Sequence, residues 1–229
     1  MRTFGSWSIH GPRTYARILH NRQWDELLHE KSWEPSVFKT AQRIKGRLFV
    51  DVGANIGQYT IPLAKNFETV IVFEPDARYA NRLIRELVRH RVRNVKVRKL
   101  AVSNKDDVDV FYYATKSERV KMGSLLPEFR HSPTGQTIRG GPGETVSCVR
   151  LDTVLAGEDV DLLKVDVEGA EFLVLQGATN LLSQGRVRHM IVELHNWEFR
   201  KSLEKLADDY GFVWNWIDSS HLFGVVART

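Results

Sequence analysis

The stretch Phe49-Val-Asp-Val-Gly-Ala-Asn-Ile-Gly-Gln-Tyr-Thr60 joins a run of apolar residues to two closely spaced glycines. The apolar residues around Asp51 predict a buried strand, and the residues after the glycines predict a helix. Gly53 and Gly57 let the backbone turn tightly and approach a bound molecule. A dinucleotide-binding turn has another glycine where Asn55 stands, so close approach of a pyrophosphate is not favoured. The carboxylate of Asp51 suits a cationic amino group instead.

Strands and helices alternate on both sides of this stretch, which predicts a doubly wound α/β domain with a mostly parallel sheet. The turn Asp218-Ser-Ser-His221 predicts a closing hairpin that makes the last strand antiparallel. Strands are predicted at 47–51, 69–73, 94–101, 108–113, 145–151, 162–167, 187–194, 212–217 and 222–227. Helices are predicted at 56–65, in the amphipathic stretch from Ala80 to Val88, and at 198–210.

The chain of 229 residues is long enough for one well-packed domain. We expect an N-terminal helical segment, residues 1–45, to pack on a core domain of residues 46–229. A segment rich in Gly, Pro and Ser predicts a long loop at 115–143, which we expect to cover a pocket. Candidate pocket-lining residues are Met122, Leu125, Leu126, Phe129 and His131 in this loop, and Trp24 and Trp33 on the opposite wall.

Composition excludes several classes of protein. Hydrophobic residues make up 42% of the chain, so it is not intrinsically disordered. The single cysteine excludes an intrachain disulfide and a cysteine-based zinc cluster. No apolar run is long enough to span a membrane, and the first residues lack the apolar core of a signal peptide. We therefore expect a cytoplasmic protein.

Two further stretches place polar residues at strand ends. Glu74 follows the second strand, 21 residues after Gly53, where doubly wound folds place an acid that binds ribose hydroxyls. In Leu162-Leu-Lys-Val-Asp-Val-Glu-Gly-Ala-Glu171, Lys164 and Asp166 lie on one face of a strand. Asp166 ends that strand, at the sheet edge where such folds bind ligands. A structural ion pair between Lys164 and Asp166 is the alternative interpretation.

Together these stretches resemble the FkbM family of class I S-adenosylmethionine-dependent methyltransferases. The resemblance runs in the family's order over roughly residues 30–195. It implies a single Rossmann-like domain with a seven-stranded sheet and a reversed last strand. The matching stretches are Phe49-Val-Asp-Val-Gly-Ala-Asn-Ile-Gly, Val72-Phe-Glu-Pro, Leu100-Ala-Val-Ser-Asn, Leu151-Asp-Thr-Val-Leu and Leu163-Lys-Val-Asp-Val-Glu-Gly-Ala-Glu.

The resemblance implies that the cofactor is S-adenosylmethionine and assigns residues to it. Glu74 corresponds to the ribose-binding acid, and Ala101, Val102 and Ser103 lie by the adenine. The remaining cofactor-binding candidates are Asp51, Gly53, Ala54, Asn55, Gly57, Tyr59, Thr60, Pro75 and Asp166. Most FkbM-like enzymes methylate hydroxyl groups, so the acceptor is expected to be a small molecule, a sugar or a glycan.

The catalytic candidates are Asp166, His195 and Glu168. His195 follows the fifth core strand and should open onto the same edge as Asp166, where a histidine beside a carboxylate can remove a hydroxyl proton. Glu193 is an alternative base, and a purely structural His195 is the alternative interpretation. A magnesium site built from Asp166 and neighbouring acids is an alternative. The acid cluster typical of catechol methylation is not recognisable, so we predict no metal site.

A second functional hypothesis rests on charge. Residues 77–99 hold nine basic side chains against Glu86 alone, a charge of +8 in a chain whose net charge is +5. Such a segment suits RNA, which makes an RNA methyltransferase the alternative function. The alternative interpretation is a solvated helix face without a binding role. A cofactor-binding protein without activity is a third possibility. The sequence identifies neither the acceptor nor the oligomeric state.

Overall fold

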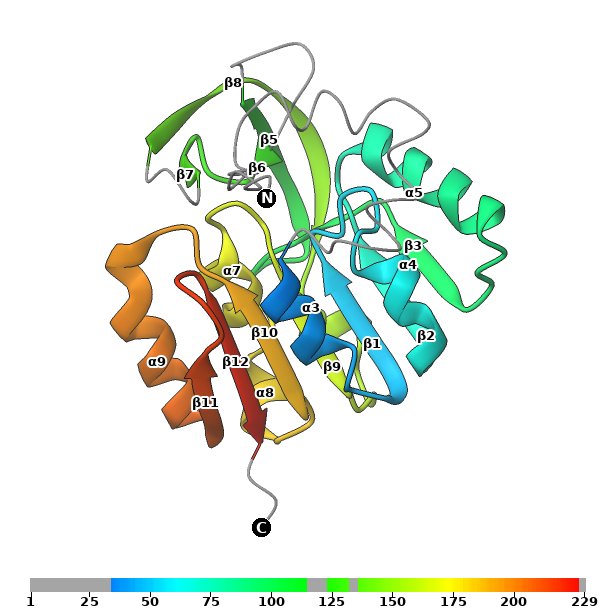
Figure 1. Ribbon diagram of the computed structural model, residues 1–229. Coiled ribbons are helices and arrows are strands. Elements are labelled where there is room, and N and C mark those ends of the chain that lie inside the picture. The colour runs from blue at the N-terminus through cyan, green and yellow to red at the C-terminus, as the bar shows by residue number, and fades with distance from the viewer. Residues whose placement is uncertain (1–33, 115–122, 132–135, 227–229) are drawn as a thin grey trace, which may run out of the picture.

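A computed structural model of the chain describes residues 34–114, 123–131 and 136–226. These residues form a seven-stranded sheet with helices on both faces, and a smaller sheet lies beyond one edge of it (Figure 1). Trp24, Trp33 and Met122 lie outside the described residues, as does most of the predicted N-terminal helical segment. None of the described helices is long and apolar enough to cross a membrane. The cytoplasmic location stays a prediction.

The seven-stranded sheet has the predicted doubly wound, mostly parallel topology. Only β12 runs against its neighbours β10 and β11, so the reversed last strand is confirmed. The strand order is β11 (Phe212–Trp216), β12 (His221–Val226), β10 (His189–Glu193), β9 (Leu162–Val165), β1 (Gly46–Val52), β2 (Phe67–Phe73) and β3 (Val95–Arg98).

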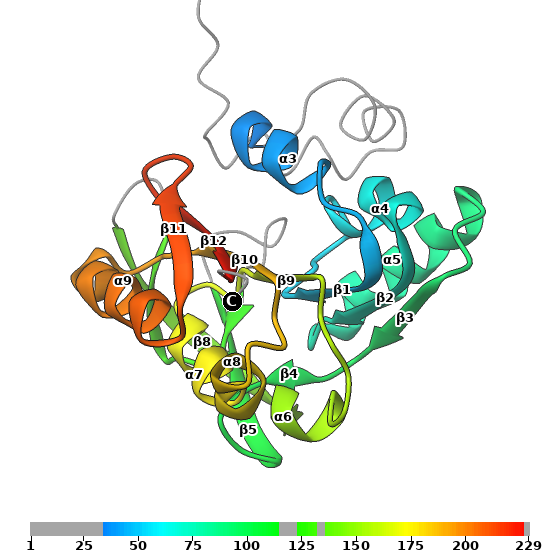
Figure 2. The same ribbon diagram turned by 90° about the horizontal axis from the view of Figure 1, so that it is seen from below.

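The helices divide into two sets on opposite faces of this sheet, as Figure 2 shows. Apolar side chains from each set pack on the buried strands, so β1 and β9 are apolar apart from Arg47 near the start of β1 and Asp51 and Lys164 near the carboxyl ends. One face holds α3 (Pro35–Ala41), α4 (Thr60–Leu63), the 3₁₀ turn η1 (Ala64–Asn66) and α5 (Ala77–Arg89). The other holds α6 (Leu151–Val154), α7 (Glu171–Gln176), α8 (Thr179–Ser183) and α9 (Arg200–Asp209), which the 3₁₀ turn η2 (Trp197–Phe199) precedes.

The second sheet corrects the predicted long loop at 115–143. Its strands are β4 (Ala101–Val102), β8 (Gln136–Val149), β5 (Asp107–Ala114) and β6 (Gly123–Ser124), and β7 (Glu128–His131) also pairs with β8. Glycine content pointed to a loop, but Gly143 lies within a strand. A Cβ there would come 2.2 Å from Val110 Cγ1, so this glycine lets β5 and β8 approach.

Two other predicted elements have different bounds. The third strand was expected to reach Ala101, but β3 ends at Arg98 and Ala101 pairs with Cys148 in the second sheet. The helix expected to start at Ile56 is much shorter, because Gly57 adopts a left-handed φ of 92° that an α-helix cannot contain.

Candidate functional site

The carboxyl ends of β1, β2, β9 and β10 meet at one edge of the large sheet. The register places Asp51 between Val72 and Lys164 on the neighbouring strands. Because β12 is antiparallel, its first residue, His221, pairs with Glu193, the last residue of β10. This edge therefore collects polar side chains from five strands.

Asp51 is buried beneath the glycine turn. Its Oδ2 accepts a hydrogen bond of 2.5 Å from the Thr60 hydroxyl, whereas its Oδ1 is buried and has no hydrogen-bond partner among the described residues. Burial raises the pKa of the Asp51 carboxyl, and the nearby Lys164 ammonium opposes that rise. The free oxygen is an acceptor for a donor that a ligand would bring.

The turn after Asp51 brings backbone close to backbone. Gly53 has a φ of 81°, and a Cβ at this position would lie 1.8 Å from the carbonyl oxygen of Asp166. Asn55 also adopts a left-handed conformation, with a φ of 53°. The predicted role of glycine in a tight turn is confirmed at Gly53, where only glycine permits β1 and β9 to end side by side.

Glu74 lies against the same turn. Its two carboxylate oxygens accept backbone N–H groups of Asn55 and Asp76, both at 2.8 Å. Burial raises the pKa of Glu74 to about 8, against the lowering effect of these two hydrogen bonds. Each oxygen keeps a second lone pair for hydroxyl donors. Pro75 follows directly and is half-buried, and Ala54 is buried in the turn itself.

The residues expected beside the adenine occupy the start of the second sheet. Ala101, Val102 and Ser103 are all buried, and the Ser103 N–H donates to the carbonyl of Val149. The Ser103 hydroxyl oxygen is buried without a hydrogen-bond partner in the described part of the chain. After Asp51 Oδ1, it is a second buried polar atom that could form a hydrogen bond with a ligand.

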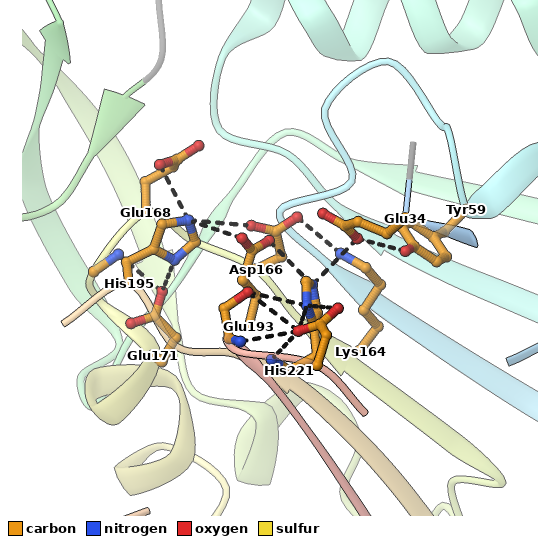
Figure 3. Close-up of polar contacts among 12 residues, drawn as sticks. Glu34, Tyr59, Lys164, Asp166, Glu168, Glu171, Glu193, His195 and His221 are labelled. Atoms are coloured by element: carbon orange, nitrogen blue, oxygen red, sulfur yellow. Dashed lines mark hydrogen bonds and ion pairs between the residues drawn. The ribbon is translucent and has the colours of Figure 1, made fainter. Parts of the chain in front are cut away.

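Lys164 and Asp166 form the ion pair that the sequence left open, with Lys164 Nζ 2.9 Å from Asp166 Oδ2. The ammonium also lies 4.6 Å from the centre of the Tyr59 ring. Tyr59 donates a hydrogen bond of 2.6 Å to Glu34 Oε2. The pair lowers the pKa of Asp166 to about 2 against the effect of burial. This ion pair leaves Asp166 Oδ1 directed toward His195 (Figure 3).

His195 lies among four carboxylates and is only 4% exposed. Its Nδ1–H donates to Glu171 Oε1 at 2.9 Å. On the other side of the ring, Nε2 faces three carboxylate oxygens: Glu168 Oε2 at 3.2 Å, Glu193 Oε1 at 3.7 Å and Asp166 Oδ1 at 3.9 Å. These negative charges raise the pKa of His195 well above 6.5 although burial opposes it, and burial raises the pKa of Glu168 to about 8. The structure thus brings the three catalytic candidates together.

His221 forms a second centre beside the first. Its Nδ1 lies 2.9 Å from Asp218 Oδ1, and its Nε2 lies 3.2 Å from Glu34 Oε2 and 3.4 Å from Glu193 Oε2. These carboxylates raise the pKa of His221 to about 12. Glu193 links the two centres, because its two oxygens face different histidines (Figure 3).

Sequence reasoning missed His221, Glu34 and Glu171 in this cluster. The hairpin turn before His221 contained a usable signal, since an antiparallel last strand must begin at the edge where the parallel strands end. Leu125 and Leu126 of the predicted lining loop pack within the second sheet. Nothing is described of the side chains of Phe129 and His131, which lie in β7.

The strand order with its reversed seventh strand, together with a glycine turn and an acid ending the next strand, defines a class I methyltransferase. A sequence profile of the methyltransferase FkbM domain matches residues 51–223, most of the chain. The chain belongs to the FkbM methyltransferase family.

Two fungal relatives are methyltransferases by name. The chain is 25% identical over 165 residues to Methyltransferase 1 of Beauveria bassiana, and the match covers 66% of each chain. It is 26% identical over 217 residues to Methyltransferase sdnD of Sordaria araneosa, and the match covers 82% of each chain. The chain thus spans slightly under two thirds of the first relative.

Solved structures share the fold at low identity. Methyltransferase FkbM from Methylobacillus flagellatus KT superposes with a TM-score of 0.53 at 14% identity, covering 93% of this chain and 57% of that one. A putative rRNA-methylase from Clostridium thermocellum superposes with a TM-score of 0.51 at 8% identity, covering 87% and 98% respectively. These likenesses show the class I fold.

Proposed function

We propose that this protein transfers a methyl group from S-adenosylmethionine to a hydroxyl group of a small molecule, a sugar or a glycan. One observation carries the proposal: the buried, unpartnered Asp51 Oδ1 lies at the sheet edge that also holds Asp166, Glu168 and His195. A cofactor half and an acceptor half of one site therefore adjoin.

The buried polar groups suit the three parts of the cofactor. Asp51 Oδ1 would accept a hydrogen bond from the amino group, Glu74 from the ribose hydroxyls, and the Ser103 hydroxyl is available to the adenine. The backbone turn at Gly53 packs against the Asp166 carbonyl and so connects the proposed cofactor residues of β1 with the proposed acceptor residues after β9. The bound cofactor supplies an electrophilic methyl group on sulfur, and the protein aligns it with the acceptor.

The polar cluster would serve the acceptor. A hydroxyl that attacks a methyl group must lose its proton, and the carboxylates of Asp166 and Glu168 are neighbouring groups that can receive it. His195, whose raised pKa keeps it protonated, would orient these carboxylates and would need to lose its own proton before it could act as the base. Trp197 follows two residues after His195 and is 42% exposed. Its ring stacks on Trp216 and lies 5.0 Å from the Arg200 guanidinium, which leaves the exposed part of the ring for contact with an apolar part of an acceptor.

RNA methylation remains the second candidate because of the basic surface on α5. Arg85 and Arg89 are exposed there. Arg78 is less available, since its guanidinium binds Asp76 and lies 4.6 Å from the centre of the Tyr113 ring. The structure thus reduces the basic surface of α5 that would contact a phosphate backbone.

An acceptor screen with S-adenosylmethionine labelled in its methyl group tests the proposal. Sugars, glycans, hydroxylated small molecules and RNA should be offered in parallel, and the position of the label should be mapped by mass spectrometry. We expect transfer to an oxygen, and loss of transfer in Asp51→Ala. Labelling of nitrogen or carbon, or of RNA alone, would contradict the proposal.

A further inference from the structure

Two buried histidines in the cluster share one arrangement. His195 and His221 are 4% and 2% exposed, and each points Nδ1 at a carboxylate oxygen 2.9 Å away. Each then turns Nε2 toward other carboxylates. A histidine that binds a metal characteristically donates its second ring N–H to a carboxylate, which fixes the tautomer and aims the free nitrogen at the ion.

The carboxylate that orients His195 is itself held by a hydrogen bond. Glu171, which accepts from His195 Nδ1, is 1% exposed and also accepts the N–H of Gly169 at 2.8 Å. Behind His221, Asp218 accepts the N–H groups of Ser220 and His221, both at 2.9 Å. Both imidazoles are therefore oriented by carboxylates that hydrogen bonds hold in place.

The shorter distances match those between adjacent ligand atoms in a coordination shell, whereas Asp166 would have to move closer. Bonds of about 2.1 Å to a divalent ion place adjacent ligand atoms about 3.0–3.4 Å apart and opposite atoms about 4.2 Å apart. His195 Nε2 lies 3.2 Å from Glu168 Oε2 and 3.9 Å from Asp166 Oδ1. One ligand atom from each of these three residues lies within 4.8 Å of the other two. The second group, Glu34, Glu193 and His221, meets the same limit.

An independent observation is that His221 Nε2 is paired by charge but not by a well-directed hydrogen bond. This atom is buried and makes no hydrogen bond of acceptable geometry with the described residues, although two carboxylates lie within 3.4 Å. Glu168 Oε2 is also buried without a hydrogen bond of acceptable geometry among the described residues. Leaving such groups unpaired is costly, and a cation between the carboxylates and the imidazoles would satisfy both.

We propose that this cluster binds two divalent cations, one held by Asp166, Glu168 and His195 and the other by Glu34, Glu193 and His221. Glu193 lies between them, with one oxygen toward each histidine. Nitrogen and oxygen donors without sulfur favour a first-row ion such as Mn²⁺ over Mg²⁺, which prefers oxygen alone. The proposal departs from the sequence-based expectation of no metal site, which was made without knowing that His221 and Glu34 lie in the cluster.

The consequence for catalysis rests on the proposed function. An acceptor hydroxyl bound to a cation gives up its proton more readily, here to a solvent water. The oxygen then forms a bond to the methyl carbon while the carbon–sulfur bond breaks, and that electron pair stays on sulfur. Cation binding itself needs no methyl transfer, so its measurement can fail or succeed independently of the proposed function.

Metal titration of the untagged full-length protein tests the proposal. After treatment with EDTA and its removal, MnCl₂ is titrated in while the signal of free Mn²⁺ is followed by electron paramagnetic resonance. ZnCl₂ and MgCl₂ are titrated separately by calorimetry. We expect saturation at two Mn²⁺ per chain, with weaker binding of Mg²⁺. Absence of binding for all three ions would overturn the proposal and leave an ion-pair network with charged imidazoles.

Variants assign the sites. His195→Gln and His221→Gln should each remove one equivalent of Mn²⁺, and Glu171→Gln should weaken the first site about 10–100-fold through His195. His189→Gln is the matched control, because His189 lies on the same strand as Glu193 but at its other end, against the Asp161 carbonyl. Retention of both equivalents in both histidine variants would overturn the assignment. Glu168→Gln, at a partly exposed position, replaces His195→Gln if the latter does not fold.

Discussion

Glu193 and His221 face each other across the antiparallel pair β10 and β12, with Glu193 Oε2 3.4 Å from His221 Nε2. The other Glu193 oxygen lies 3.7 Å from His195 Nε2. The strand reversal that closes the sheet thereby also completes the polar cluster, because it brings the first residue of β12 to the edge where β10 ends. The antiparallel strand β12 therefore both completes the sheet and supplies His221 to the polar cluster.

The first prediction concerns Glu74 and the cofactor. Glu74→Gln replaces one acceptor oxygen by an NH₂ group that would meet a backbone N–H of Asn55 or Asp76. We expect S-adenosylhomocysteine to bind more weakly by about 1–3 kcal/mol. Calorimetry measures this directly, with Glu144→Gln in the second sheet as a control. Unchanged affinity would remove Glu74 from the cofactor site.

The pH dependence of cofactor binding gives a second prediction. Ribose hydroxyls donate to an ionised Glu74, whereas in the free protein its pKa is raised to about 8, so below that pH binding must release a proton. Affinity for S-adenosylhomocysteine should therefore rise from pH 6 toward 8, by at most about tenfold per unit, and level off above. Glu74→Gln should abolish this slope. A wild-type slope that persists in the variant would belong to another group.

A third prediction separates close contact from backbone strain. Gly53 and Gly157 have nearly the same φ, 81° and 82°, but a Cβ at Gly157 meets nothing within 4 Å. Gly157→Ala should lower the free energy of unfolding by about 1 kcal/mol. Gly53→Ala should cost about 1–3 kcal/mol more, because its Cβ would overlap the Asp166 carbonyl. Thermal unfolding of both variants measures the difference. Equal decreases in the free energy of unfolding would show that the backbone around Gly53 moves to accommodate the Cβ at little cost.

The parts of the site found from the sequence are local in the chain. Asp51, Glu74, Asp166 and His195 each lie at or near the end of a mostly apolar predicted strand, so recognising the strand also located the residue. Parallel topology then predicted that these ends meet. Their convergence at one edge is confirmed by the strand register and contacts, while their cofactor and catalytic roles stay predictions.

The parts that were missed depend on pairing between distant segments. Glu34 reaches the cluster only because α3 packs beside β1, and no local pattern marks it. The second sheet was missed for a related reason: β5 pairs with a strand that is distant in the sequence, and the glycines within that strand, β8, resemble a loop. Propensity cannot distinguish a glycine that allows strand approach from one that ends a strand.

A fourth prediction concerns turnover. His195→Ala should lower kcat about 10²–10⁴-fold on the true acceptor and leave affinity for S-adenosylhomocysteine nearly unchanged, since its contacts are with Asp166 and Glu168 in the proposed acceptor half of the site. His189→Ala should leave both quantities unchanged. Comparing melting temperatures first ensures that a folded variant is assayed. Near-full activity of His195→Ala would exclude His195 from the proton path and from an essential metal site together.

The last prediction addresses the basic surface of α5. Arg85 and Arg89 are exposed on the solvent side of a helix whose other face is buried through Ala80, Leu83 and Leu87. This helix flanks the sheet, so these arginines would recruit a polyanion and take no part in methyl transfer.

The double variant Arg85→Glu and Arg89→Glu should bind S-adenosylhomocysteine like the wild type. If RNA is the acceptor, the variant should also bind RNA more weakly and with a smaller dependence on salt, by about one or two phosphate contacts. Arg43→Glu and Lys45→Glu provide a matched control, since both are exposed beyond the end of α3 and reverse the same charge. Filter binding across a salt series distinguishes the outcomes. Equal RNA binding by the wild type, the α5 variant and the control variant would identify the basic surface of α5 as a solvated helix face. The hydroxyl of a small molecule or glycan would then be the favoured acceptor.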